Sequence, residues 1–472
     1  MYQLFTKIIN KILNCVQDVK QLKALRLLNK TWNELGTARL SQKSSVELNS
    51  PQRLKLYLKK LEMLEAITIS PHRSLHISSC DIIEETERHL FSVIKLTRPK
   101  ELHLTNCYFL NLRHLLNNLA DLSSICNGSL YCVSINDIRF LSKNNIDYEE
   151  CEERNFKFEE MKPIVSKFIS WSSIRKLELT DSFSDVDESF DTLNFPWSTV
   201  LPCLINLNIL HVQLANSEDL SEVITALLDL KVVPRITEWS SFLSNMTAEQ
   251  MQSLQVLNLP LKSLDLSLMM ESAVCAQTLA SLLLSYGQTL ENLKVLIDHD
   301  TDEFDYALPI ENQNILMSRL IHMEWMTNAV PVNLLAICPN LKSLNVSEVN
   351  QNLFVKEIVK PRLKNPCGNK ILENLTSFSL ECEVLREENL LLIGKAFPNM
   401  KKLCLFLDDS KIRSIYKGFP NLEELFVLGN EVTDIGFAGW PLKCSCSEEG
   451  EQENEKFTIA CLASKSTVNL VF

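Results

Sequence analysis

The sequence predicts an α/β solenoid, a chain of strand–helix units that stack one on the next. Two stretches near the C-terminus, FPNMKKLCLF from Phe397 and FPNLEELFVL from Phe419, repeat one phrase with almost the same spacing of apolar residues. The 472 residues exceed the usual size of one domain, so the chain either has several domains or grows by repetition. The repeated phrase favours growth by repetition.

The phrase has the form L-x-x-L-x-L, and CPNLKSLNVSE provides a third clear copy with Leu341, Leu344 and Val346. The alternation at its end is typical of a strand, in which every second side chain turns inward. A first strand is expected within 43–50. Looser copies of the phrase occupy 61–70, 98–107, 172–181, 207–214, 261–268, 290–298, 320–326 and 372–380.

Helix-like segments separate the phrases, for example 218–230, 275–287 and 387–397. A strand followed by a helix, repeated every ~20–35 residues, is the signature of the leucine-rich repeat, whose units bury their apolar faces only by stacking. We therefore expect a parallel sheet on a concave side and helices on a convex side. The alternative is an ordinary α/β domain with similar strands, which ten or so phrases of one spacing disfavour. The stretches 133–177 and 210–264 are each expected to hold a degenerate unit or an insertion.

In each L-x-L the middle residue points away from the core and onto the concave face of the sheet. This face is the predicted substrate-binding surface. In the last two repeats the outward residues are apolar and predict an apolar patch, which either binds a partner or is covered by the C-terminal tail, 443–472. The tail is expected either to cap the solenoid or to fold back into its concavity. The predicted substrate-binding residues are His103, Glu178, Asp265, Asn345, Glu381, Cys404, Phe406, Phe426 and Leu428.

Residues 1–42 lack the phrase and show helical spacing of large apolar residues instead. Asp18 is a plausible N-cap for a second helix, and Gly36 a plausible helix stop. A piece this short cannot hide all of its apolar side chains in a core of its own, so some must face a neighbour or a partner. One interpretation is a plain helical cap, which the first repeat of a solenoid needs.

The stretch KIINKILNCVQDVKQLKALRLLNKTWNEL (7–35) resembles the F-box, a small trihelical module that docks on the SKP-type adaptor of cullin–RING ubiquitin ligases. F-boxes usually open with Leu-Pro and an acidic residue, positions at which this chain has Phe5 and Lys7. The adaptor-binding residues that the resemblance implies are Leu4, Phe5, Ile8, Ile9, Ile12, Leu13, Val16, Leu22, Leu25 and Trp32.

Composition and charge exclude several classes of partner. The net charge of −12 argues against nucleic acid, which requires a basic surface. No run approaches the ~18 apolar residues that span a membrane, and the N-terminus lacks the apolar region of a signal peptide. The 15 cysteines are scattered without a Cys-x-x-Cys pair, a pattern typical of reduced thiols in the cytoplasm or nucleus.

No pattern predicts a metal site, a cofactor or a catalytic residue. His72 and His76 are spaced like ligands on a helix, but the segment is expected to be a loop and no third ligand is near. The run from Asp298 resembles a calcium loop, yet Glu303 and Pro309 stand where that loop needs glycine and glutamate. Phosphate-binding, nucleophile-elbow and zinc-protease motifs are also missing from the sequence.

Together these observations predict an F-box-like module (1–42), an irregular leucine-rich-repeat solenoid (43–442) and a tail (443–472). The resemblance implies a substrate receptor of an SCF-type ubiquitin ligase in ubiquitin-dependent protein degradation. Its partners would be an SKP-type adaptor, a cullin and an unknown protein substrate, and it would not itself be an enzyme. The alternatives are a leucine-rich-repeat scaffold or inhibitor unrelated to ubiquitin, and an enzyme with a hidden cysteine site.

Overall fold

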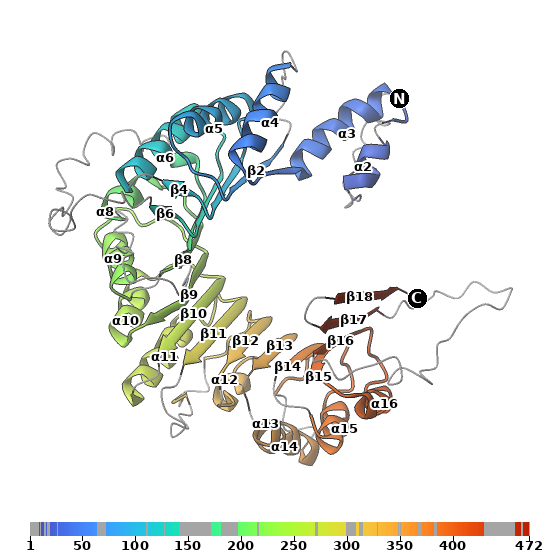
Figure 1. Cartoon of the computed structure of the whole chain (residues 1–472). Helices are drawn as coiled ribbons and strands as arrows, with labels where there is room; N and C mark the ends of the chain where they lie inside the picture. The colour runs from blue at the N-terminus through green and yellow to red at the C-terminus, as the bar shows by residue number, and fades with distance from the viewer. Residues whose placement is uncertain are drawn as a thin grey trace, which may run out of the picture. The chain divides into compact units, whose positions relative to one another are not determined.

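Two compact units make up the chain, Met1–Ile236 and Thr237–Phe472. In each unit parallel strands lie side by side and helices lie on one face of the sheet (Figure 1). We call the face opposite the helices the open face. The structure, a computed structural model, describes residues 9, 11–13, 16, 19–25, 27–63, 72–109, 112–126, 128–140, 171–180, 197–214, 217–269, 272–298, 308–310, 315–327, 329–347, 349, 351–365, 371–381, 385–428, 458–463 and 466–471.

The N-terminal unit has its strands in the order β1-β2-β3-β5-β7-β8, each parallel to the next. These strands are β1 (Ser45–Leu48), β2 (Ser74–Ser78), β3 (Glu101–Thr105), β5 (Cys132–Asn136), β7 (Lys176–Thr180) and β8 (Ile209–Gln213), and a separate small pair is β4 (Tyr108–Phe109) with β6 (Arg139–Phe140). The helices are α2 (Val19–Leu25), α3 (Lys30–Lys43), α4 (Pro51–Met63), α5 (Glu84–Thr97), α6 (Leu112–Cys126), α8 (Trp197–Val200), the 3-10 turn η3 (Leu201–Cys203) and α9 (Ser217–Leu228).

The C-terminal unit also contains neighbouring repeat strands, which follow one another in chain order from β9 to β18. They are β9 (Glu238–Met246), β10 (Ser263–Met269), β11 (Asn292–Asp298), β12 (His322–Met326), β13 (Ser343–Ser347), β14 (Ser377–Glu381), β15 (Lys402–Phe406), β16 (Glu424–Leu428), β17 (Thr458–Ala463) and β18 (Ser466–Val471). The helices are α10 (Ala248–Leu257), α11 (Ala273–Ser285), α12 (Val332–Ala336), α13 (Gln351–Phe354), the π-helical η4 (Val355–Val359), α14 (Lys360–Lys364), α15 (Glu387–Ala396) and α16 (Asp409–Gly418). All pairs are parallel except β17–β18, which is antiparallel.

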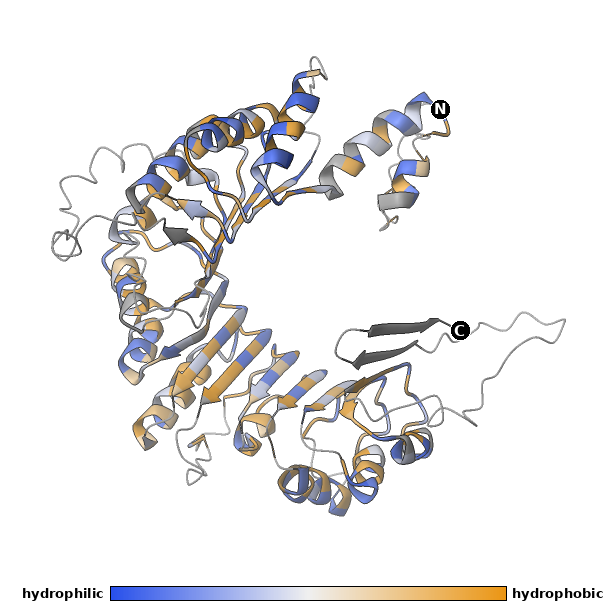
Figure 2. Ribbon diagram, viewed as in Figure 1, coloured by the Kyte–Doolittle hydropathy of each residue, from blue (hydrophilic) through white to orange (hydrophobic). Residues whose placement is uncertain are grey.

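The leucines of the repeated phrase form the core. Leu102 and Leu104 on β3 are each 1% exposed, and the residue between them is half-buried on the opposite face. The same alternation recurs on β7, β14 and β15. Figure 2 shows it as bands of hydrophobic and hydrophilic residues along the strands of the C-terminal unit. The predicted leucine-rich-repeat solenoid is confirmed.

One strand lies elsewhere than the sequence predicts. The stretch 61–70 was expected to be a strand, but Leu61–Met63 end α4, because Leu54, Leu58 and Leu61 continue one buried helical stripe. The strand of that repeat is β2, further along the chain, so His76 lies on a strand and not in the expected loop. The two stretches without a clear phrase, 133–177 and 210–264, hold the repeat strands β5 and β9.

An asparagine three residues before the strand ties several repeats to the repeat before them. Its side-chain amide donates a hydrogen bond of 2.7–2.9 Å to a backbone carbonyl oxygen of the preceding turn. These bonds explain the asparagine of the Pro-Asn opening at Asn340 and Asn421. The pairs are Asn206 to Ser172, Asn340 to Ser318, Asn374 to Pro339 and Asn421 to Pro398.

The N-terminal helices have a core of their own. Ile9, Leu13 and Leu22 are buried together, and the partly buried side chains of Val16, Leu25, Trp32, Leu35 and Leu40 pack against them. Asn29 caps α3 by accepting a hydrogen bond of 3.1 Å from the backbone N–H of Trp32. Across the described ranges, no helix is both long enough and apolar enough to cross a membrane.

Candidate binding surface of the sheets

In the N-terminal unit the middle residues of the strands form one row across the open face. The row contains the predicted residues His103 and Glu178, and most of its side chains are half-buried. Alternation places them there because the leucines on either side turn into the core. Neighbours in register are Glu47, His76, His103, Ser134, Glu178 and His211.

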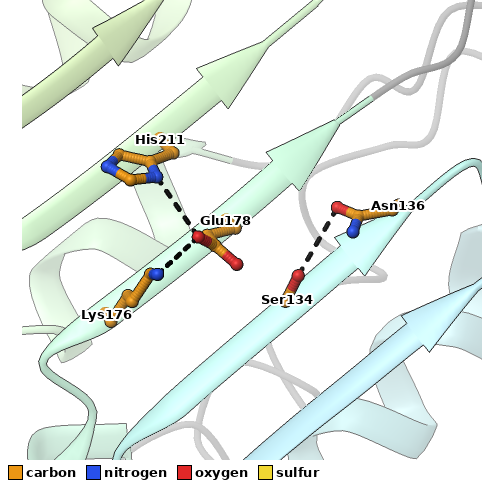
Figure 3. A network of polar contacts seen from close by, with 5 residues as sticks. All are labelled: Ser134, Asn136, Lys176, Glu178 and His211. Carbon is orange, nitrogen blue, oxygen red and sulfur yellow. Dashed lines mark hydrogen bonds and ion pairs between the residues drawn. The ribbon is translucent and has the colours of Figure 1, made fainter. Parts of the chain in front are cut away.

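Glu178 is the centre of a polar network on this face (Figure 3). Its carboxylate accepts from Lys176 Nζ at 2.6 Å and from His211 Nδ1 at 3.2 Å. Burial raises the pKa of Glu178, but hydrogen bonds from His211, Lys176 and Ser134, together with the charge of Lys176, outweigh it and bring the pKa to about 2. The carboxylate therefore stays charged, and its bonds hold it in place.

The next pair along the row is aromatic. The imidazole rings of His76 and His103 stack with centroids 4.2 Å apart and planes inclined by 4°. Burial, followed by the neighbouring His76, lowers the pKa of His103. The lowered pKa favours the neutral form of the His103 imidazole. Among the described residues no cluster of three or more His, Cys, Asp or Glu could hold a metal ion.

The C-terminal unit carries a longer row that changes character along the sheet. The row begins with charged and polar side chains and ends with apolar ones. Its members in register with described side chains are Ser240, Asp265, Lys294, Glu324, Asn345, Ser379, Cys404 and Phe426. The predicted residues Asp265, Asn345, Cys404 and Phe426 therefore share this one row.

The predicted apolar patch lies on β15 and β16. Cys404 is in register with Phe426, and Phe406 with Leu428. Cys404, Phe406 and Phe426 are half-buried, and the side chain of Leu428 lies outside the described residues. Of the tail, β17 pairs with β16 at the edge of the sheet and β18 pairs antiparallel with β17.

The residues expected to contact an adaptor fall into three groups. Ile9, Leu13 and Leu22 form the module's own core, and Val16, Leu25 and Trp32 pack against it. Ile12 is 43% exposed. Leu4, Phe5 and Ile8 lie outside the described residues.

Among the described residues of the module, the most exposed large apolar side chains are two that the expected adaptor-binding residues do not include. Leu27 is 86% exposed and Leu28 61% exposed, in the turn between α2 and α3. Their backbone N–H groups donate to the carbonyl oxygens of Ala24 and Leu25, which fixes the turn. They follow closely after Leu25, the last side chain of α2 that packs against the module's core, and this position is the signal that could have identified them.

Comparison with known proteins gives only distant likenesses. No family model matches the chain, and no curated protein matches it in sequence. One similar solved structure is the yeast complex of Rad7 and Elc1, at 15% identity and a TM-score of 0.39 over 91% of this chain and 89% of that one. Another is the leucine-rich-repeat-containing protein LegL7 from Legionella pneumophila, at 13% identity and a TM-score of 0.35 over 80% of this chain and 97% of that one. At these scores neither likeness bears on the function of this chain.

Proposed function

We propose that this chain is a non-catalytic substrate receptor of an SCF-type ubiquitin ligase. The helical module, 1–42, docks an SKP-type adaptor and through it a cullin, and the open face of the solenoid binds a protein substrate. Ubiquitin transfer belongs to other subunits. The chain contributes proximity, because a bound substrate lysine experiences a raised effective concentration of the charged conjugating enzyme.

The observation that carries the proposal is the pair of exposed leucines, Leu27 and Leu28, on a module that already has a buried core. Surface leucines do not contribute to that core, and exposed neighbouring apolar side chains mark protein interaction sites. Ile12 adds a third exposed apolar side chain to the module. A plain cap for the first repeat has no need of exposed leucines in a turn.

Five of the described cysteines, all of them buried, are consistent with a non-catalytic role. Burial raises the pKa of Cys80, Cys132 and Cys338 to about 12 and that of Cys107 and Cys126 to about 11. The thiolate is the nucleophile, so these thiols are poor candidates for covalent catalysis.

Affinity purification of the full chain from cell lysate tests the proposal. An SKP-type adaptor and a cullin should co-purify with the wild type and be lost with Leu27→Asp plus Leu28→Asp. A charge placed in an apolar interface opposes binding by several kcal/mol, on the order of a hundredfold or more. Leu56→Asp is the matched control, because Leu56 on α4 is 58% exposed and lies outside the module.

The double variant changes exposed side chains, so its module should keep its helicity by circular dichroism. Adaptor capture that survives in the double variant, or that is lost equally in the Leu56 control, contradicts the proposed docking site. Capture of other proteins without adaptor or cullin favours a scaffold or inhibitor unrelated to ubiquitin.

A further inference from the structure

The open face of β13 carries hydrogen-bonding atoms that have no partner. Asn345 Oδ1 and Ser347 Oγ are both buried and, within the part of the chain that the structure describes, make no hydrogen bond. Ser347 is only 4% exposed. A buried polar atom left unpaired costs about 1–3 kcal/mol, so native proteins keep few of them. A bound ligand that donates hydrogen bonds at this position would remove the cost.

A carboxylate lies next to these atoms. Glu381 on β14 is in register with Ser347 and is half-buried. No described residue forms an ion pair or a hydrogen bond with it, whereas Glu324, on the other side of β13, is paired with Lys294 at 3.0 Å. The site therefore combines one free negative charge with two atoms that can accept hydrogen bonds.

Such a site selects a cation with several donors. A guanidinium group carries five N–H donors in a planar fork and remains charged at all physiological pH values. It can pair with a carboxylate and still donate to an amide oxygen and a hydroxyl. An ammonium group has three donors and is more strongly hydrated, so arginine fits this set of acceptors better than lysine.

Apolar side chains adjoin the acidic site on the next strands. Cys404 on β15 is in register with Ser379 on β14 and with Phe426 on β16. Neighbouring strands lie ~4.8 Å apart, so the step from β14 to β16 is about 10 Å. In an extended peptide, residues two apart are separated by ~7 Å and residues four apart by ~13 Å, both on one face. The spacing in the peptide thus differs by ~3 Å from the distance between β14 and β16 in either case, and the flexible arginine side chain is long enough to span this difference.

We propose that the open face of β13–β16 binds an extended segment of a partner protein in which an arginine lies two or four residues from a large apolar side chain. The arginine pairs with Glu381 and donates to Asn345 and Ser347, and the apolar side chain packs on Phe406 and Phe426. The inference rests on the proposed substrate-binding role of the sheet and names the chemistry of its ligand.

A library of random nonapeptides, with Arg, Lys, Glu or Ala fixed at the fourth position, tests this on the purified full chain. The Arg pool should be enriched most, with Phe, Leu, Ile, Met or Trp selected at the second or the sixth or the eighth position. For a selected peptide, Glu381→Gln should weaken binding at least tenfold. Glu388→Gln is the matched control, because Glu388 is exposed at the start of α15 in the same repeat.

A charge reversal protects the test against misfolded variants. Glu381→Arg should lose the selected peptide and gain binding to the same peptide with Glu in place of Arg, a gain that an unfolded chain cannot produce. An Arg pool that is no better than the Glu pool, an unaffected Glu381→Gln variant, or no enrichment at all overturns the proposal. The readout does not involve the adaptor, so failure here leaves adaptor capture intact, and failure of adaptor docking leaves peptide binding intact.

Discussion

The close approach of two helices at glycines gives a sharp test of the packing behind the apolar patch. Gly394 on α15 lies against the backbone of Gly418 at the end of α16. A Cβ atom at position 394 would lie 2.8 Å from the carbonyl carbon of Gly418 and 3.0 Å from its Cα, and would also meet its carbonyl oxygen. Carbon atoms normally approach to ~3.5–4.0 Å, so Gly394→Ala forces the helices apart by about 0.5–1 Å.

The cost follows from the rigidity of the contact. Overpacking typically costs ~1–3 kcal/mol, and backbone atoms cannot rotate away as a side chain can, which favours the upper half of that range. Alanine returns up to ~1 kcal/mol of helix propensity, leaving a net loss of about 1–2 kcal/mol. For a unit of this size each kcal/mol lowers Tm by roughly 2–4 °C, so a drop of about 2–8 °C is expected.

Gly418→Ala is the matched control, since its nearest neighbour would be Leu391 Cδ2 at an ordinary 3.8 Å. Thermal and urea denaturation should rank the variants as Gly418→Ala at or above the wild type and Gly394→Ala below it. Hydrogen exchange should locate the loss in α15 and α16. A Gly394→Ala chain as stable as the wild type would refute the reasoning about the helix contact.

Two further predictions concern the repeats. Burial, followed by the charge of His76, lowers the pKa of His103. Below pH ~6.5 the folded chain therefore binds fewer protons at His103 than the unfolded chain does, and the free energy of unfolding should fall with acidification. In urea denaturation, His103→Gln should make this fall between pH 7 and pH 5 smaller. An unchanged pH profile in that variant would contradict the assignment. Asn421→Ala should lower the free energy of unfolding by about 1 kcal/mol, because it removes the hydrogen bond to Pro398. Asn292→Ala, at an exposed position on β11, is the control and should leave Tm unchanged. Equal losses in the two variants would show that the bond does not matter.

The leucine alternation predicted most strands because every second side chain of a repeat strand is buried, and the buried positions are mostly leucines. The phrases at β3, β7 and β10 fell where the strands lie, since each places a leucine inward at every second position. β5 has no clear phrase because Val133 and Ile135 take the place of the leucines, so only a degenerate unit or an insertion could be expected there. At 61–70, Leu61 satisfied the strand template although it belongs to a helical stripe on α4 that starts seven residues earlier, at Leu54. A six-residue window cannot separate the two periods.

The binding surfaces were harder to predict than the fold. Alternation places His103, Glu178 and Asn345 on the open face, but the stacking of His76 on His103 and the unpartnered atoms on β13 depend on which strands become neighbours. In the helical module, periodicity identifies apolar residues without saying which of them face the module's own core. Leu13 and Leu28 look alike in the sequence, yet one is 1% exposed and the other 61%.

The asparagine bonds between repeats have a direction. In each of the four pairs the donor belongs to the later repeat and the acceptor to the earlier one, as with Asn340 and Ser318 or Asn374 and Pro339. During synthesis the N-terminal part of a chain folds first, at ~5–20 residues added per second. The carbonyl acceptor is therefore synthesised before the asparagine that donates to it. The solenoid can lengthen one unit at a time, because no asparagine depends on an acceptor that is still to be synthesised.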